Sequence, residues 1–199
     1  MSHAATMNQE TLLERPVGID NAKLATWLFL CSEIMFFAGL IGSYIVLRLG
    51  ALHWPQPGKI LNIPLTGFNT FVLICSSVTM VKAFYWCEMG NQKKLKQHIF
   101  STFLFGVLFL SIQAFEYHKL YVHHGLHPEG NLYGTCFYIL TGFHGCHVLG
   151  GVIAMFVLLI KSLLGHFTKE HHAPVELVGL YWHFVDLVWI ILFTIVYLI

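Results

Sequence analysis

Five long apolar runs constrain the fold of this sequence more than any other feature. They lie at about residues 24–48, 65–88, 97–119, 132–160 and 175–198. A run of about twenty apolar residues lets a helix cross the roughly 30 Å hydrocarbon core of a bilayer. Because the runs are continuous rather than alternating, they favour helices over the strands of a β-barrel. We therefore expect an all-α, polytopic membrane protein with five transmembrane helices in one bundle.

The composition agrees with a membrane-embedded chain. Of the 199 residues, 56% are hydrophobic and 11% are charged, whereas charged residues make up about 25% of a typical soluble domain. The connections between the runs are too short to hold a separate soluble domain. We expect a cytoplasmic tail at residues 1–22 and a single transmembrane domain at residues 23–199. The net charge of +1 gives no reason to expect a nucleic-acid partner.

The distribution of basic residues predicts the orientation of the helices. Loops on the cytoplasmic side of a membrane carry an excess of lysine and arginine. Most basic residues outside the runs lie in the N-terminal tail and near the second and fourth connections. That group is Arg15, Lys23, Lys93, Lys94, Lys96, Lys161 and Lys169, and the smaller opposite group is Arg48, Lys59 and Lys119. We therefore expect a cytoplasmic N-terminus and an external C-terminus.

Polar side chains inside the apolar runs are the candidate functional residues. A charged group at the centre of a bilayer costs about 3 kcal/mol or more, so such groups face other helices or water. At about 1.5 Å of rise per residue, Glu33, His147 and the polar pair of the last run fall in one layer of the membrane. We expect two others near the outer end, in reach of water or headgroups, and one near the inner end. The whole set is Glu33, Gln113, Glu116, His144, His147, Glu176, His183 and Asp186, with Gln113 and Glu116 outermost and Glu176 innermost.

The spacing of these residues predicts contacts between helices. His144 and His147 are three positions apart, as are His183 and Asp186, so each pair lies on one face of its helix. Turning such a face to lipid is strongly unfavourable, so both faces should meet other helices. We expect His147 to be the partner of Glu33.

Small residues spaced four apart indicate close helix packing. Glycine, alanine, serine and cysteine let two backbones approach within a membrane. Such residues occur in the first and fourth runs. They are Ala38, Gly39, Gly42 and Ser43 in the first, and Gly142, Cys146 and Gly150 in the fourth. We expect these positions to be sites of tight helix contact.

Three chemical interpretations of the histidines remain open. The HxxH spacing of His144 and His147 is compatible with ligation of a metal or haem. A proton relay through Glu33, His147 and Asp186 is also physically reasonable, because carboxyl and imidazole groups form such chains in membranes. In the third interpretation, which we favour, the groups form buried hydrogen bonds that fix how the helices pack.

Four segments together resemble a known family. SEIMFFAG, QAFEYH, TGFHGCHVLGG and YWHFVDLVWIILF, in chain order, are similar to the hallmark segments of subunit III of the haem–copper respiratory oxidases. The resemblance runs from about Leu24 to the C-terminus and is to the five-helix bacterial form. It implies a non-catalytic subunit of a cytochrome c or quinol oxidase in the bacterial cytoplasmic membrane.

The resemblance also implies partners and cofactors. Subunit I carries the haem and copper that reduce oxygen to water and drives proton pumping, and this chain would stabilise subunit I and support its proton uptake. Subunits II and IV and membrane lipids are the other implied partners, with no metal or other cofactor in this chain except a bound phospholipid. The alternative is a freestanding redox or ion-translocating membrane protein that uses the intramembrane His, Glu and Asp residues.

Particular residues correspond to positions of the family. Glu33 corresponds to its buried carboxylate in the first segment. Lys161 stands where the family often has an arginine, which makes it a candidate ligand for a lipid phosphate. The other intramembrane polar positions of the family are matched by His144, His147, Glu176, His183 and Asp186.

Overall fold

The computed structural model describes residues 21–123, 125–128, 130–168 and 172–199. These residues form helices and connecting segments, without a strand among them. Five of the helices are long and apolar enough to cross a membrane, which confirms the all-α polytopic fold. Almost all of the expected tail at 1–22 lies outside the described residues. The helices are α2 (Asn21–Gly50), α3 (Pro57–Ile60), α4 (Ile63–Glu88), α5 (Gln92–His123), α6 (Leu132–Leu163), α7 (Ala173–Leu192) and the π-helix η1 (Phe193–Leu198).

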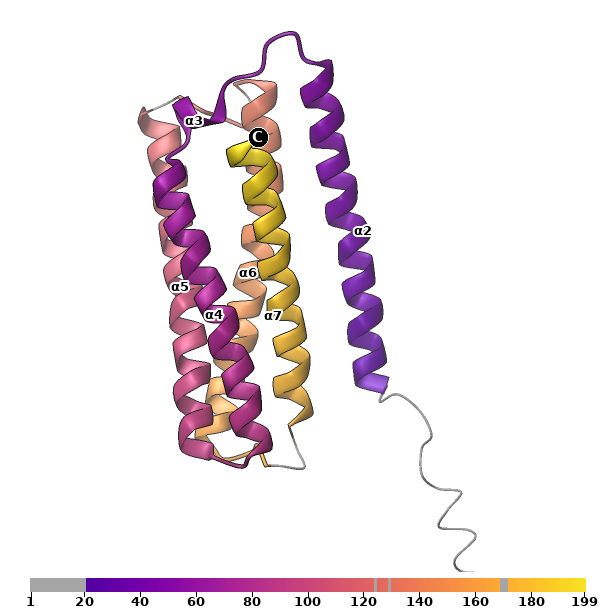
Figure 1. Ribbon diagram of the computed structural model, residues 1–199, viewed down its shortest axis with the longest axis vertical. Helices are drawn as coiled ribbons and strands as arrows, with labels where there is room; N and C mark the ends of the chain where they lie inside the picture. Colours follow the sequence, from indigo (N-terminus) through magenta and orange to yellow (C-terminus); the bar gives the residue numbers. More distant parts are fainter. Residues whose placement is uncertain (1–20, 124, 129, 169–171) are drawn as a thin grey trace, which may run out of the picture.

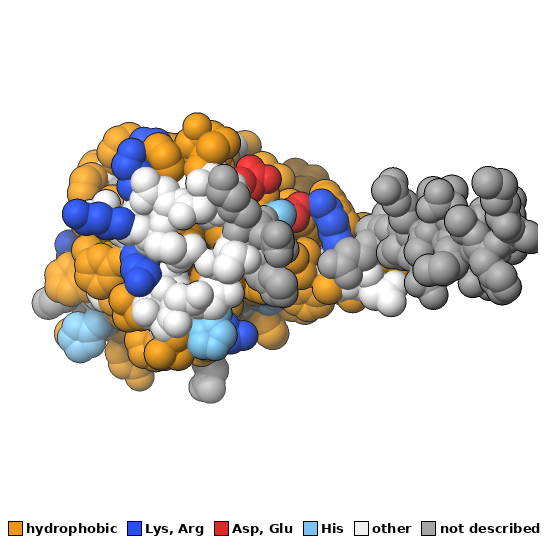
Figure 2. Space-filling view, turned by 90° about the horizontal axis from the view of Figure 1, so that it is seen from below, with side chains coloured by type: hydrophobic (Ala, Val, Ile, Leu, Met, Phe, Trp, Pro, Cys, Tyr) orange, Lys and Arg blue, Asp and Glu red, His pale blue; other side chains and the backbone are white. Residues whose placement is uncertain are grey.

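Successive long helices run in opposite directions along the molecule (Figure 1). Helices α4, α5, α6 and α7 form a bundle, and α2 stands beside it, against α6 and α7. The short helix α3 and the C-terminus lie at one end of the bundle. The α4–α5 and α6–α7 connections lie at the opposite end, which we call the inner end because most of the described basic residues occur toward it. Figure 2 views the inner end, where polar and basic groups are bordered by hydrophobic side chains.

Local sequence signals explain where the helices begin and turn. Asn62 precedes α4 and its Oδ1 accepts a hydrogen bond from the Leu65 N–H at 3.3 Å. Asn131 caps α6 in the same way, with its Oδ1 2.6 Å from the Gly134 nitrogen. Such side chains satisfy donors that the first helical turn leaves free. Gly90, with φ of 74°, supplies the left-handed residue that the tight α4–α5 turn requires.

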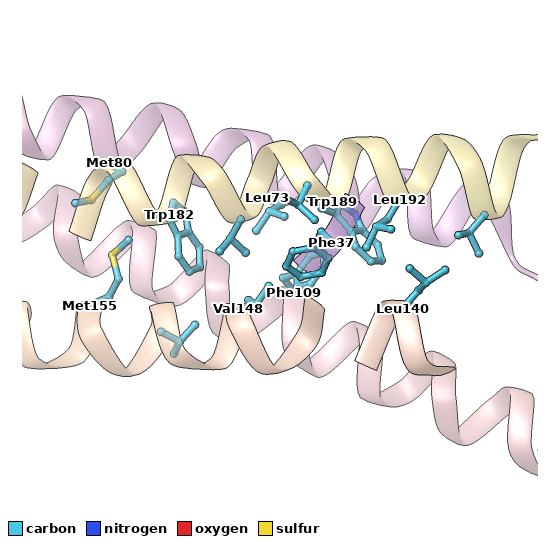
Figure 3. Packing of buried hydrophobic residues seen from close by; sticks show 14 of the residues in the cluster. Phe37, Leu73, Met80, Phe109, Leu140, Val148, Met155, Trp182, Trp189 and Leu192 are labelled. Carbon is cyan, nitrogen blue, oxygen red and sulfur yellow. The ribbon is translucent and has the colours of Figure 1, made fainter. Parts of the chain in front are cut away.

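The core of the bundle is formed by large side chains of α7 packed against the other helices. Trp182 and Trp189 are fully buried, and Figure 3 shows them among Leu73 of α4, Phe109 of α5 and Val148 of α6. Their indole N–H groups donate to hydroxyl groups of α4, so each tryptophan buries a large apolar surface without leaving its polar atom unpaired.

Two glycines make room for Trp182. A Cβ atom on Gly106 of α5 would lie 2.8 Å from the indole Cη2 atom, and one on Gly151 of α6 would lie 2.7 Å from its Cε3 atom. Side-chain atoms do not approach this closely. The backbones of α5 and α6 therefore hold the tryptophan ring between them.

The expectation of tight packing at the two glycines of α2 was wrong. A Cβ on Gly39 or Gly42 would meet no atom within 4 Å. Instead α2 turns Leu30, Phe37 and Tyr44 toward the bundle, and these residues are buried. The physical reason is that a helix with apolar residues all around does not reveal which face meets its neighbours.

Candidate functional site

Glu33 of α2 and His147 of α6 form an interhelical pair, as expected. The imidazole Nε2 lies 2.8 Å from the carboxyl Oε2. The other ring nitrogen, Nδ1, lies 2.7 Å from the carbonyl oxygen of Phe143. Because a carbonyl only accepts, Nδ1 must carry a proton. One further proton then lies between Nε2 and Oε2, so the pair is either imidazolium with carboxylate or imidazole with carboxylic acid.

Aromatic side chains surround this pair. The ring centroids of Phe37 and His147 are 5.0 Å apart, and the Phe36 ring lies 6.1 Å from the same imidazole. The hydroxyl of Tyr181 in α7 donates to the His147 carbonyl at 2.9 Å. Three helices therefore meet at one polar site in an apolar setting, where hydrogen bonds have little competition from water.

His183 and Asp186 lie on the side of α7 that faces α4. The Nδ1 atom of His183 is 2.8 Å from the hydroxyl oxygen of Ser77. This contact meets the expectation of an interhelical bond. The Asp186 side chain is buried, and its Oδ1 atom has no hydrogen-bond partner among the described residues. Both residues therefore interact with Ser77 of α4, and one Asp186 oxygen is left unpaired.

His144 lies inside the bundle rather than beside α2. Its Nε2 atom donates to the carbonyl oxygen of Val185 at 3.1 Å, and its ring lies 4.7 Å from that of Trp189. Its side chain is fully buried. His144 and His147 therefore make different interhelical contacts. Among the described residues, no group of three or more His, Cys, Asp or Glu side chains is placed to hold a metal ion.

The expectation that Gln113 and Glu116 are reached by water or headgroups was wrong. Gln113 is only 5% exposed and Glu116 only 3% exposed. The Glu116 Oε1 accepts a hydrogen bond from the Thr66 hydroxyl at 2.7 Å, and Tyr197 of η1 donates to its Oε2 at 3.5 Å. Gln113 donates to the carbonyl oxygen of Thr141 at 3.0 Å. Neighbouring helices cover this part of α5, which sequence position alone does not reveal.

Glu176 and Lys161 lie toward the inner end, in the first turn of α7 and the last turn of α6. Glu176 forms an ion pair with Lys23 of α2, with Nζ and Oε1 2.5 Å apart. The Lys161 side chain is exposed and forms no ion pair with a described carboxylate.

Several functional contacts involve hydroxyl residues that the sequence analysis did not single out. They share a position within an apolar helix and a partner on another helix. A Ser, Thr or Tyr inside an apolar run is the signal that could have identified them, because its hydroxyl needs a partner in the membrane. They are Thr66, Thr70, Ser76, Ser77, Tyr181 and Tyr197.

A family model and several known proteins that are similar to this chain all bear the same name. A family model described as cytochrome c oxidase subunit III matches residues 14–199. A probable cytochrome c oxidase subunit 3 of Nocardia farcinica is 41% identical over 186 residues, covering 93% of this chain and 90% of that protein. Cytochrome c oxidase subunit 3 of Corynebacterium diphtheriae is 38% identical over 190 residues, with coverage of 94% and 91%. The protein of the same name from Loxodonta africana is 35% identical over 191 residues, with coverage of 92% and 71%.

Proposed function

The chain belongs to the cytochrome c oxidase subunit III family, and we propose that it is the non-catalytic subunit III of a proton-pumping haem–copper terminal oxidase. In this role it packs beside subunit I, which holds the haem and copper and reduces oxygen to water. Subunits II and IV complete the assembly in the bacterial cytoplasmic membrane. The chain stabilises subunit I and supports its uptake of protons.

The proposal is supported by the pairing of intramembrane polar groups between helices. Glu33 pairs with His147, His183 with Ser77, and Glu116 with Thr66. Each of these contacts joins two helices. Polar groups committed to each other in this way act as fasteners, with each bond contributing about 0.6 to 2 kcal/mol in a membrane. This use fits a rigid supporting subunit better than a relay, whose groups must exchange partners during turnover.

The proposed role in proton supply is based on the basic and histidine side chains at the inner end. Basic side chains gather around that end (Figure 2), and His166 is exposed there. Imidazole groups exchange protons near neutral pH, and fixed charges shape the local concentration of ions. The residues concerned are Lys93, Lys94, Lys96, His166 and His172, together with His171, which lies outside the described residues. Lys161 is proposed as a contact for a lipid phosphate at the same membrane surface.

Purification of the tagged chain from its own membrane tests the accessory role. We expect it to bring a larger subunit that carries haem, and we expect the Soret absorption to stay with that larger subunit when the two are separated. Mass spectrometry of the complex identifies the accompanying subunits. A Soret band on the separated chain, with no larger haem subunit in the preparation, would show a freestanding redox protein instead.

A further inference from the structure

A hollow of about 390 Å³ lies at the inner end of the α4–α5 hairpin. From α4 it is lined by Lys82, Tyr85 and Trp86, and from α5 by Lys94, Gln97 and His98. On each helix the second and third of these residues lie three and four positions after the first, so they form one continuous face. The hollow is separate from the Glu33–His147 pair, and none of the interhelical bonds described above uses its residues.

The hollow combines positive charge with an aromatic wall. The Lys94 ammonium lies 3.7 Å from the centre of the Trp86 ring. The ring holds this group in place through a cation–π interaction, which leaves ammonium hydrogens free for an acceptor. Lys82 and Lys94 form no ion pair with a described carboxylate, and no carboxylate lines the hollow. The hollow is therefore a preorganised place for an anion.

The depth of Lys82 indicates which anion the hollow receives. Lys82 lies six positions before the end of α4 at Glu88, which is about 9 Å at 1.5 Å per residue. A lysine at this depth extends its apolar stem along the helix so that its ammonium reaches the headgroup layer. Tyrosine and tryptophan prefer the same layer. The hollow thus lies at the level where phospholipid phosphates occur.

We propose that the α4–α5 hollow binds the phosphate of an anionic phospholipid headgroup. Lys82 and Lys94 contact the phosphate oxygens, Gln97 and His98 hydrogen-bond the polar headgroup, and Tyr85 and Trp86 support its glycerol portion. The acyl chains extend along the exposed apolar side chains Val78 and Val81 of α4. This site does not depend on the oxidase function, because it needs only the membrane location of the hairpin.

The test uses the full chain together with the subunits that purify with it. After removal of native lipid by detergent, phosphatidylglycerol is added and the lipid-bound fraction is counted by native mass spectrometry. The double variant Lys82→Gln/Lys94→Gln should weaken the tightest site about twenty-five-fold, since each lysine near a membrane surface contributes about fivefold to binding an anionic lipid. The control variant Lys93→Gln/Lys96→Gln removes the same charge from the same end but lines no part of the hollow, and should leave this affinity unchanged.

One further variant and one further lipid distinguish a specific site from general attraction to surface charge. Trp86→Leu keeps both lysines but removes the aromatic ring that contacts Lys94, so this variant should also bind phosphatidylglycerol more weakly. The unmodified chain should bind phosphatidylcholine more weakly than phosphatidylglycerol. Equal weakening by the two lysine pairs would overturn the proposal in favour of general surface charge. An unchanged affinity in Lys82→Gln/Lys94→Gln would overturn it outright. Displacement of the lipid by an equal concentration of glycerol 3-phosphate would show a site for a soluble phosphate instead.

Discussion

At the level of single residues, the proton shared by Glu33 and His147 explains how this polar pair fits into an apolar environment. The carbonyl of Phe143 fixes the Nδ1–H tautomer, and this leaves one proton to be shared across the 2.8 Å Nε2–Oε2 contact. The pair is electrically neutral in either arrangement, which explains how it is accommodated among aromatic rings. Helix rise places Glu33 and His147 at one depth, so a contact between them could be predicted from sequence. His183 and Asp186 fall in the same layer, so depth alone does not select His147 as the partner.

Substitutions of Glu33 separate hydrogen bonding from charge. In Glu33→Gln the amide can donate to Nε2 while Nδ1 still donates to Phe143, so the fold should be kept with a loss of about 0.6 to 2 kcal/mol. In Glu33→Lys an ammonium faces the imidazole without a carboxylate, so assembly should fail. Thermal stability and yield of the purified complex measure both effects. Wild-type yield and stability in Glu33→Lys would show that the pair does not hold α2 in place.

Other residue contacts could not be predicted from sequence. Glu116 is covered by Tyr197, which projects from the π-helix η1 at the end of α7. A π-helical turn shifts side chains relative to an α-helix of the same sequence, and the apolar segment FTIVYL gives no sign of it. Position along the chain therefore placed Glu116 near an end of its helix but could not show that it is buried.

At the scale of helices, the number of spans could be predicted and their facing could not. Each expected run lies inside one helix or, for the last, inside α7 and η1, because apolar length determines which segments cross a membrane. The contact faces depend on shape. Gly106 and Gly151 admit Trp182, whereas Gly39 and Gly42 lie opposite open space. All four are glycines in apolar helices, so the sequence alone does not separate them.

Replacing single glycines with alanine tests this distinction. Gly151→Ala would place a methyl group 2.7 Å from the ring of buried Trp182, and such overpacking costs about 1 to 3 kcal/mol. Gly39→Ala meets no atom within 4 Å, and alanine is favoured over glycine within a helix by about 1 kcal/mol. Unfolding of the two variants in mixed micelles should therefore show a lower free energy of unfolding only for Gly151→Ala.

Destabilisation by Gly39→Ala would contradict the expected difference between the two variants. If Gly39→Ala lowered the free energy of unfolding as much as Gly151→Ala does, then α2 would pack more tightly than the structure indicates. The Leu30, Phe37 and Tyr44 face would then not be the principal contact of α2 with the bundle.

At the scale of the whole molecule, the antiparallel bundle leaves two different ends. One end carries α3 and the C-terminus (Figure 1), and basic side chains gather at the other (Figure 2). The order of the spans requires this alternation, so it could be predicted from sequence. The position of α2 beside α6 and α7 could not, because loop lengths permit several lateral arrangements of five helices and side-chain fit selects among them.

We propose that this chain sustains an oxidase without carrying its redox centre. Steady oxygen consumption by complexes with and without the chain, followed over many turnovers from about pH 6 to pH 9, tests this claim. Without the chain, haem content and the initial rate should be retained. Activity should then decline during turnover, fastest at high pH, where protons are scarce and a proton-collecting surface matters most. Immediate loss of all activity together with bleached haem spectra would contradict the claim, because the redox centre would then depend on this chain.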